Sequence, residues 1–184
     1  MKKYILIISI LIIGTMAIGC SRPYENVTTL GSPEYKGTTV SKVAIFVSVN
    51  DIALRESTEK WFVEEFMNYK VNAVESYKIF SPLKTYTPQE MMRIFKKNNV
   101  DSYLVVNITN ASENTVVYGK WGFLSAGQKK VSYTTDTKLY VLNNTDPIWE
   151  ASYQSKDYSR SDYDDIGYDI AYAIVGAYEK DLKK

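Results

Sequence analysis

The chain of 184 residues has no histidine and only one cysteine, Cys20. A single cysteine excludes an intramolecular disulfide, and the absence of histidine excludes the cysteine and histidine ligand sets of structural zinc sites. Catalysis by Ser-His-Asp or Cys-His arrangements is excluded as well, because both need an imidazole that accepts a proton near neutral pH. Any enzymatic reaction would depend on carboxylates, lysines or tyrosines, and two carboxyl groups are enough for glycosidases. We expect no bound metal and no cofactor.

An excess of charge of one sign is also missing. Residues 1–19 contain two of the 22 basic residues and none of the 21 acidic ones, which leaves 20 basic against 21 acidic residues in the rest of the chain. A protein that binds nucleic acid needs a basic surface to neutralise phosphates. We therefore expect no nucleic acid as a partner.

Long apolar runs are limited to one segment, from Tyr4 to Gly19, which follows Lys2 and Lys3. Its 16 residues are fewer than the roughly 20 that an α-helix needs to cross the hydrocarbon layer. The pattern of basic residues, a short apolar core and small residues is typical of a secretory signal peptide. We predict a signal peptide over residues 1–19.

The apolar segment ends in AIGC, Ala17 to Cys20. A small residue and a cysteine directly after an apolar core resemble the lipobox of bacterial lipoproteins, although Ala17 stands where leucine is usual. The resemblance implies that the Cys20 thiol carries a diacylglyceryl group, with acyl chains such as palmitate that anchor the protein in a membrane. The alternative is an inert cysteine after an ordinary signal sequence. Because Ser21 is not aspartate, we expect the outer membrane, facing the periplasm, or the outer face of the cell membrane if there is only one.

The composition divides the remaining chain into two parts. Residues 20–41 are rich in Ser, Pro, Thr and Gly and predict a flexible tether with an r.m.s. span of about 25 Å. In the alternative, part of this segment packs on the domain as an edge strand. Residues 42–184 have enough apolar content for one domain with a core of its own.

The first half of this domain alternates between strands and helices. Lys42–Val49 is almost continuously apolar, as in an internal strand covered on both faces, and Asp51 can cap the helix that follows. A short strand is expected over 71–77. Thr87 and Glu90, with a proline between them, form a capping box for a second helix, which ends near Asn98 and Asn99 before a strand over 100–109. This order favours parallel strands joined by right-handed crossovers.

The second half predicts an antiparallel meander. Strands are expected over 115–121 and 131–142, and the second alternates between apolar and polar residues, as in a strand buried on one face. A returning strand contains Trp149, and a helix over 162–182 closes the chain. The predicted fold class is therefore a single α/β domain with a mixed sheet, in which β-α-β-α-β is followed by a meander and a C-terminal helix.

Three segments carry a resemblance to a known group: KVAIFVSV at 42–49, NNVDSYLVVNIT at 98–109 and LYVLNNTDPIWEASY at 139–153. With the lipobox and the tether, they resemble the envelope lipoproteins related to the amino-terminal domain of TolB, which include the penicillin-binding-protein activator lipoproteins. The resemblance implies a non-enzymatic module that binds another envelope protein or packs into an envelope complex. The secretion lipoproteins of this group have long hairpins, and because the strands predicted here are short, we expect no channel.

The loop GKWGFLSAGQKK, residues 119–130, is the candidate for partner binding. Trp121, Phe123 and Leu124 lie among glycines at an expected hairpin tip, where exposed aromatic side chains are typical interface anchors. In the alternative, the loop folds back and buries them. The loop is not a Walker motif, because neither Ser nor Thr follows Lys120.

Acidic and tyrosine-rich segments provide the competing hypothesis of a cell-wall glycan-binding or hydrolytic domain. An EF-hand loop counted from Asp162 lacks ligands at its fifth and twelfth positions, so these acids are expected in the first turn of a helix. The adjacent pairs Glu64 with Glu65 and Asp164 with Asp165 are poor dyads, because neighbours on a helix point to different faces. Other residues considered are Glu75 and the tyrosines Tyr153, Tyr158, Tyr163, Tyr168 and Tyr172.

Overall fold

The computed structural model describes residues 26–31, 38, 40–81, 83–116, 128–142, 144–155 and 163–182, with backbone alone at 110–116, 128–131 and 182. The predictions for the signal peptide, for Cys20 and for the loop residues Trp121, Phe123 and Leu124 concern residues outside this part of the chain.

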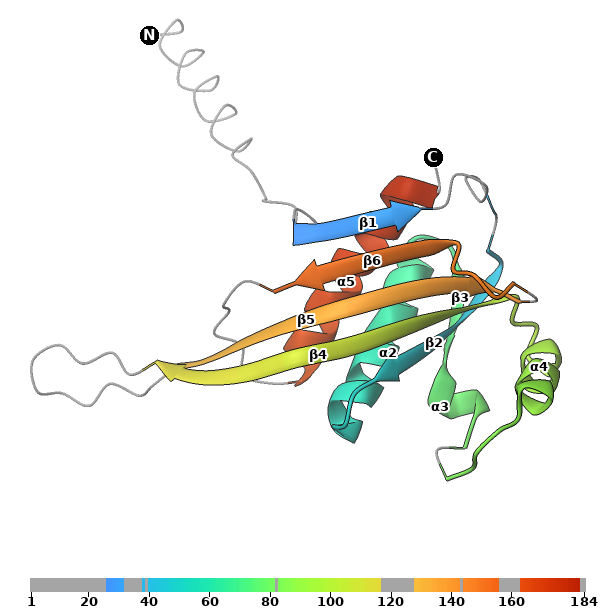
Figure 1. The fold of residues 1–184 in the computed structure, drawn as a ribbon, viewed down its shortest axis with the longest axis horizontal. Coiled ribbons are helices and arrows are strands. Elements are labelled where there is room, and N and C mark those ends of the chain that lie inside the picture. Colours follow the sequence, from blue (N-terminus) through green and yellow to red (C-terminus); the bar gives the residue numbers. More distant parts are fainter. Residues whose placement is uncertain are drawn as a thin grey trace, which may run out of the picture.

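The described residues form one mixed sheet with helices on its faces (Figure 1). The strand order is β1-β6-β5-β4-β2-β3. The strands are β1 (Val27–Gly31), β2 (Lys42–Ser48), β3 (Asn72–Glu75), β4 (Ser102–Val116), β5 (Gln128–Val141) and β6 (Trp149–Gln154). The helices are α2 (Ile52–Asn68), α3 (Ser76–Ile79), α4 (Pro88–Lys97) and α5 (Tyr163–Leu182).

The sheet confirms the predicted fold class. β2 pairs in parallel with both β3 and β4, whereas β4, β5 and β6 form an antiparallel meander. Parallel neighbours require crossovers, and α2 and α4 lie in the two connections. The C-terminal helix α5 packs on α2, on one face of the sheet.

β1 lies within the segment predicted as a tether. It pairs antiparallel with β6, from Val27 opposite Tyr153 to Gly31 opposite Trp149. For residues 27–31 the prediction of a flexible tether is therefore wrong. The alternative, an edge strand packed on the domain, is what the structure has. Its physical basis is that the edge of β6, which would otherwise expose unpaired backbone groups, gains a ladder of hydrogen bonds.

The hairpin of β4 and β5 differs from the prediction. Instead of separate strands at 100–109 and 115–121, one 15-residue strand runs from Ser102 to Val116. The mostly polar residues 110–114 were left outside both predicted strands, but pairing with β5 resumes at Ser112 after a register shift between Thr109 and Ser112. Pairing with β5 keeps the strand intact, because a bulge absorbs the irregularity. The prediction of short strands was wrong, and the argument against a channel that rested on it fails.

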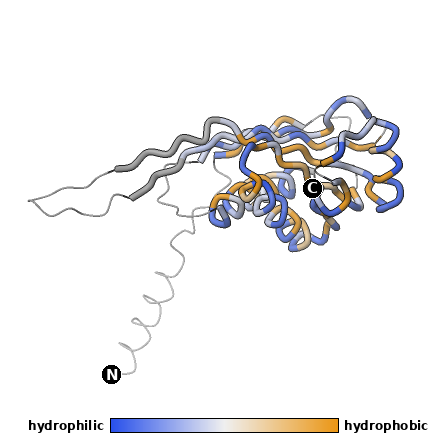
Figure 2. Tube along the Cα trace, turned by 90° about the horizontal axis from the view of Figure 1, so that it is seen from below, coloured by the Kyte–Doolittle hydropathy of each residue, from blue (hydrophilic) through white to orange (hydrophobic). Residues whose placement is uncertain are grey.

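The main core lies between the sheet and the helices α2 and α5 (Figure 2). The face predicted for the C-terminal helix is buried as expected, and α2 contributes the buried rings of Phe62 and Phe66. The buried residues of the predicted α5 face are Ile166, Ile170, Ile174, Ala177 and Tyr178. At this core, alternate residues of β5 are buried, which confirms the one-face pattern.

A second cluster on the opposite face covers only the β2 and β3 side of the sheet. Phe80 and Phe95 pack there against the ring of Phe46, with centroid distances of 5.4 Å and 6.1 Å. Strand β2 is therefore covered on both faces, as predicted. Over β5, β6 and β1 this face has no helix among the described residues.

Local signals set the helix ends. The Thr87 hydroxyl accepts from the Glu90 backbone N–H and the Glu90 carboxylate accepts from the Thr87 N–H, which confirms the capping box. After Asn98, Asn99 adopts a φ of 53°, a conformation that asparagine tolerates better than most residues. Among the helices of the described ranges, none combines the length and apolar character needed to cross a membrane.

Candidate functional site

A groove of about 990 Å³ lies where β2 ends and α2 begins, beside the middle of β4. In α/β sheets, ligands bind preferentially outside the carboxyl ends of parallel strands. The groove has an apolar floor that includes Phe46 and Val105, and polar groups at its rim. The polar rim residues are Ser48, Asn50, Asp51, Arg55, Asn107, Thr109, Asp136 and Tyr163.

Asp51 joins the groove to two helices. Its carboxylate accepts from the backbone N–H of Leu54 at 3.0 Å, which caps α2, and from the Tyr163 hydroxyl at 2.6 Å, which ties in the start of α5. The hydrogen bond from Tyr163 is the main cause that lowers the pKa of Asp51, and the bond from Leu54 adds to it. Asp51 therefore remains ionised at neutral pH and serves as a structural cap as well as a rim group.

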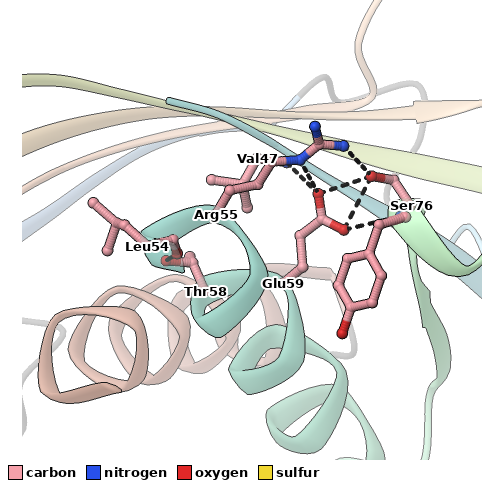
Figure 3. Close-up of polar contacts among 7 residues, drawn as sticks. Val47, Leu54, Arg55, Thr58, Glu59 and Ser76 are labelled. Carbon is pink, nitrogen blue, oxygen red and sulfur yellow. Dashed lines mark hydrogen bonds and ion pairs between the residues drawn. The ribbon is translucent and has the colours of Figure 1, made fainter. Parts of the chain in front are cut away.

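A buried charge network lies beneath the groove (Figure 3). Glu59 is fully buried, and its Oε1 accepts from the Arg55 Nε at 3.1 Å and from the Ser76 hydroxyl at 2.8 Å. The backbone N–H of Val47 donates to the same oxygen at 3.2 Å. Arg55 also donates to the Ser76 hydroxyl at 3.0 Å. The network joins β2, α2 and α3 and fixes the Arg55 side chain at the groove wall.

A second, smaller groove of about 470 Å³ crosses the open face of the sheet. It shares Asn107 and Asp136 with the first groove and continues over β5, β6 and β1. Lys138 and Glu150 form an ion pair of 3.3 Å across its floor. Asp136 is exposed and lines both grooves, so one carboxylate lies where the two grooves meet.

Another carboxylate lies on the helix side of the sheet. Asp169 of α5 is only 5% exposed and accepts from the hydroxyls of Tyr133 and Tyr153, both at 2.6 Å. Two hydrogen bonds satisfy the buried charge and hold α5 against β5 and β6. This arrangement is structural, because Asp169 lines neither of the two grooves.

The carboxylate pairs proposed from the sequence do not form a dyad. Glu64 is near Lys60 at 3.9 Å on the surface, whereas Glu65 is buried, and burial raises the pKa of Glu65. This confirms that the two point to different environments. Asp164 accepts from the Ser57 hydroxyl at 2.6 Å. Asp164 and Asp165 both lie in the first turn of α5, which confirms the prediction that these acidic residues begin a helix.

The remaining candidates have separate positions. Glu75 pairs with Lys78 at 2.6 Å. Tyr153 is buried, whereas Tyr163 and Tyr168 are 43% and 39% exposed. The Tyr168 ring stacks on that of Tyr172, with centroids 5.6 Å apart. Tyr158 and Asp162 lie outside the described residues, within which no group of three or more acidic or cysteine side chains is arranged to hold a metal ion.

Sequence reasoning did not identify Arg55, Glu59 or Asp136 as parts of the candidate site. Arg55 and Glu59 are spaced i, i+4 on a predicted helix, which is an ordinary surface pair. Nothing local shows that Ser76 and the backbone of β2 would enclose them. Asp136 belongs to the alternating pattern of β5, and its position at the groove depends on the pairing of β5 with β4.

No protein-family model matches this chain, and no curated protein matches it. Two solved structures of the PelC dodecamer from Paraburkholderia phytofirmans are similar to it at 12% identity, with TM-scores of 0.55 and 0.54. The first match covers 81% of this chain and 95% of the PelC chain. At this identity the likeness shows a shared fold.

A lipoprotein from Neisseria meningitidis, GNA1162, is also similar in structure. It is 8% identical, with a TM-score of 0.47, and the match covers 76% of this chain and 99% of that one.

Proposed function

We propose that this chain is a lipid-anchored protein of the cell envelope that acts as a non-enzymatic binding or assembly module. The attachment point is Cys20, directly after the predicted signal peptide, and the domain lies at the outer membrane facing the periplasm, or on the outer face of the cell membrane if there is only one. Its partner is another envelope protein or further copies of the same chain.

The fold shared with PelC carries the proposal of an assembly role. The likeness extends over most of both chains, and the PelC structures are dodecamers. Support comes from the carboxylates of the described residues. Asp51, Glu59 and Asp169 are each engaged by donors that stabilise the fold, so none of these three is free to act as a general acid or base.

The anchor is tested with Cys20→Ala. We expect the wild-type protein in the membrane fraction with radiolabelled palmitate attached, and the variant unprocessed or released from the membrane. Ser21→Ala is the matched control and is expected to behave as wild type. Normal lipid labelling of the Cys20→Ala protein would refute the anchor.

The assembly role is tested on the detergent-solubilised full chain by light scattering and by affinity capture after cross-linking in cells. We expect either a defined oligomer or one envelope protein in stoichiometric amount. A monomer that captures no stoichiometric partner would contradict the proposal.

The second candidate function is cell-wall glycan binding or hydrolysis, and the polar grooves favour it. Asp136 is exposed and lines both grooves, so its carboxylate can accept hydrogen bonds from the hydroxyl groups of a sugar, whereas hydrolysis would need a second carboxyl group beside it. Retention of the protein on peptidoglycan, lost in Asp136→Asn and kept in the surface control Glu64→Gln, would support this candidate over the assembly role.

A further inference from the structure

The distance between the proposed anchor and the folded domain is short, because β1 begins close to Cys20. Val27 is the first residue of β1 and is paired with Tyr153. Seven peptide units separate Cys20 from Val27, so the two Cα atoms can lie at most about 25 Å apart. If the whole segment up to Ser41 were free, the Cα atom of Cys20 could lie roughly 75 Å from the start of β2. Pairing of β1 with β6 therefore shortens the reach of the anchor about threefold.

Strand pairing determines which end of the sheet the anchor reaches. Val27 lies opposite Tyr153, which lies opposite Thr135 of β5. Thr135 in turn lies opposite Ile108 of β4. The preceding residue of β4, Asn107, lies opposite Ser48, which is the last residue of β2. The anchor is therefore attached at the end of the sheet where β2 ends and α2 begins. In Figure 1 the start of β1 lies at the same end as the ends of β2 and β4.

The hairpin of β4 and β5 projects from this same end (Figure 1). Pairing with β6 ends at Thr134, which is opposite Thr109, whereas β4 and β5 remain paired up to Val116 and Gln128. The two-stranded ribbon thus extends by residues 110–116, which corresponds to about 23 Å at 3.3 Å per residue. Its length is close to the maximum reach of the anchor.

The size of the domain limits how it can lie on a membrane. A folded chain of this length is roughly 40 Å across. A reach of at most about 25 Å does not allow the attached end to be the one farthest from the lipid surface. The orientation in which the opposite end, with the β5–β6 turn, faces the membrane is therefore excluded.

We infer that the end of the sheet where β1 starts faces the lipid surface, with the β4–β5 ribbon directed at the headgroups. This inference rests on the proposed anchor at Cys20. It assigns the lipid surface as the partner of this end of the molecule, and it leaves the opposite end, with α4 and the β5–β6 turn, facing away from the membrane.

Single-cysteine labelling tests the orientation, because the one natural thiol is consumed by the proposed lipid. Ala53→Cys places a dye in the exposed first turn of α2, at the same end of the sheet as the start of β1, and Thr145→Cys places it in the exposed β5–β6 turn at the far end. Thr115→Cys places it on the ribbon. The full lipidated protein is bound to vesicles of phosphatidylethanolamine and phosphatidylglycerol that carry a headgroup energy acceptor.

We expect energy transfer to be greatest from Thr115→Cys, intermediate from Ala53→Cys and at least about twofold lower from Thr145→Cys, given the size of the domain. The matched control inserts twenty Gly and Ser residues after Ser21, which adds roughly 70 Å of reach. In that variant the difference between the three positions should largely disappear.

The two proposals can fail separately. If the protein does not float with the vesicles, the anchor is refuted and the orientation with it. If it floats and transfer is equal from the three positions, or greatest from Thr145→Cys, the orientation is overturned while the anchor stands. Unchanged thermal unfolding of each cysteine variant shows that the label reports on the native fold.

Discussion

Glu59 is a carboxylate that the fold encloses completely, at the junction of β2, α2 and α3. An isolated buried charge is unfavourable by several kcal/mol, and here the Arg55 guanidinium together with hydroxyl and backbone donors compensates it. The same contacts hold Arg55 beside the larger groove. Stability and the shape of the candidate site therefore depend on one side chain.

Replacing this carboxylate should destabilise the protein. We expect Glu59→Gln to lower the free energy of unfolding by about 2 to 3 kcal/mol, because Arg55 loses its counter-charge and one amide group cannot satisfy all the donors. Urea denaturation measures the change. The control Glu64→Gln affects an exposed pair with Lys60 and should change stability by less than about 0.5 kcal/mol. If the two substitutions lowered the free energy of unfolding equally, the proposed stabilising role of the Glu59 network would be contradicted.

Glu90 has the most strongly lowered pKa that the structure gives, at about 2. The main cause is the hydrogen bond from Lys84 at 2.8 Å, and the Thr87 backbone N–H adds to it. Because this pKa is lower when folded than the ordinary value of 4.5, ionised Glu90 favours the folded state fully above pH 4.5, and the contribution is lost as the pH falls toward 2.

An NMR titration of the Glu90 carboxyl carbon measures this pKa directly. Lys84→Ala should raise the pKa of Glu90 toward its ordinary value, since the principal donor is removed. Lys96→Ala, a change in the last turn of the same helix, should leave it unchanged. A pKa of Glu90 near 4.5 in the wild type would show that the hydrogen bonds from Lys84 and from the Thr87 backbone N–H are not formed in solution.

At the scale of elements, the close approach of α2 and α5 depends on Gly167. A Cβ atom at this position would lie 3.1 Å from the backbone N and Cα of Thr58, a distance at which one of the two helices must shift. Gly167 is also the sixth residue counted from Asp162, where an EF-hand loop has its glycine. In this structure its role is to let two helix backbones approach each other.

We expect Gly167→Ala to lower the unfolding free energy by about 1 to 3 kcal/mol, because overpacking exceeds the gain in helix propensity. Thermal unfolding followed by circular dichroism measures it. The matched control is Gly31→Ala in β1, where the nearest atom would be 3.8 Å away and the effect should be small. A stabilised Gly167→Ala protein would mean that the helices are farther apart than in this structure.

The elements themselves were largely predictable from the sequence, since capping and alternation are local signals. Asp51, the capping box and the buried face of α5 all follow from neighbours within a few residues. The exceptions are β1, which lies in the segment predicted as a tether, and the long strand β4, where the mostly polar residues 110–114 were left outside the predicted strands. A partner strand stabilises this segment, and intrinsic propensity does not include that contribution.

At the scale of the whole molecule, β1 connects the anchor region to the sheet. A chain that starts at residue 32 lacks β1 and leaves the edge of β6 unpaired. We expect a lower unfolding temperature and association that increases with protein concentration, because an open edge can pair with another chain. Differential scanning calorimetry and light scattering measure both. An unchanged unfolding temperature, compared with a chain that starts at residue 22 and keeps β1, would contradict this role.

The sequence alone determined the absence of histidine chemistry, the fold class and most helix ends, because these depend on composition or on residues close along the chain. The anchor at Cys20 is likewise a prediction from the sequence. The tertiary structure decided three features: the pairing of β1 with β6, the continuous β4–β5 ribbon, and the groups around Glu59. Each joins segments that are distant in the sequence or continues past a locally unfavourable stretch. Local patterns do not specify such contacts, because their stability comes from which surfaces meet when the sheet and its helices assemble.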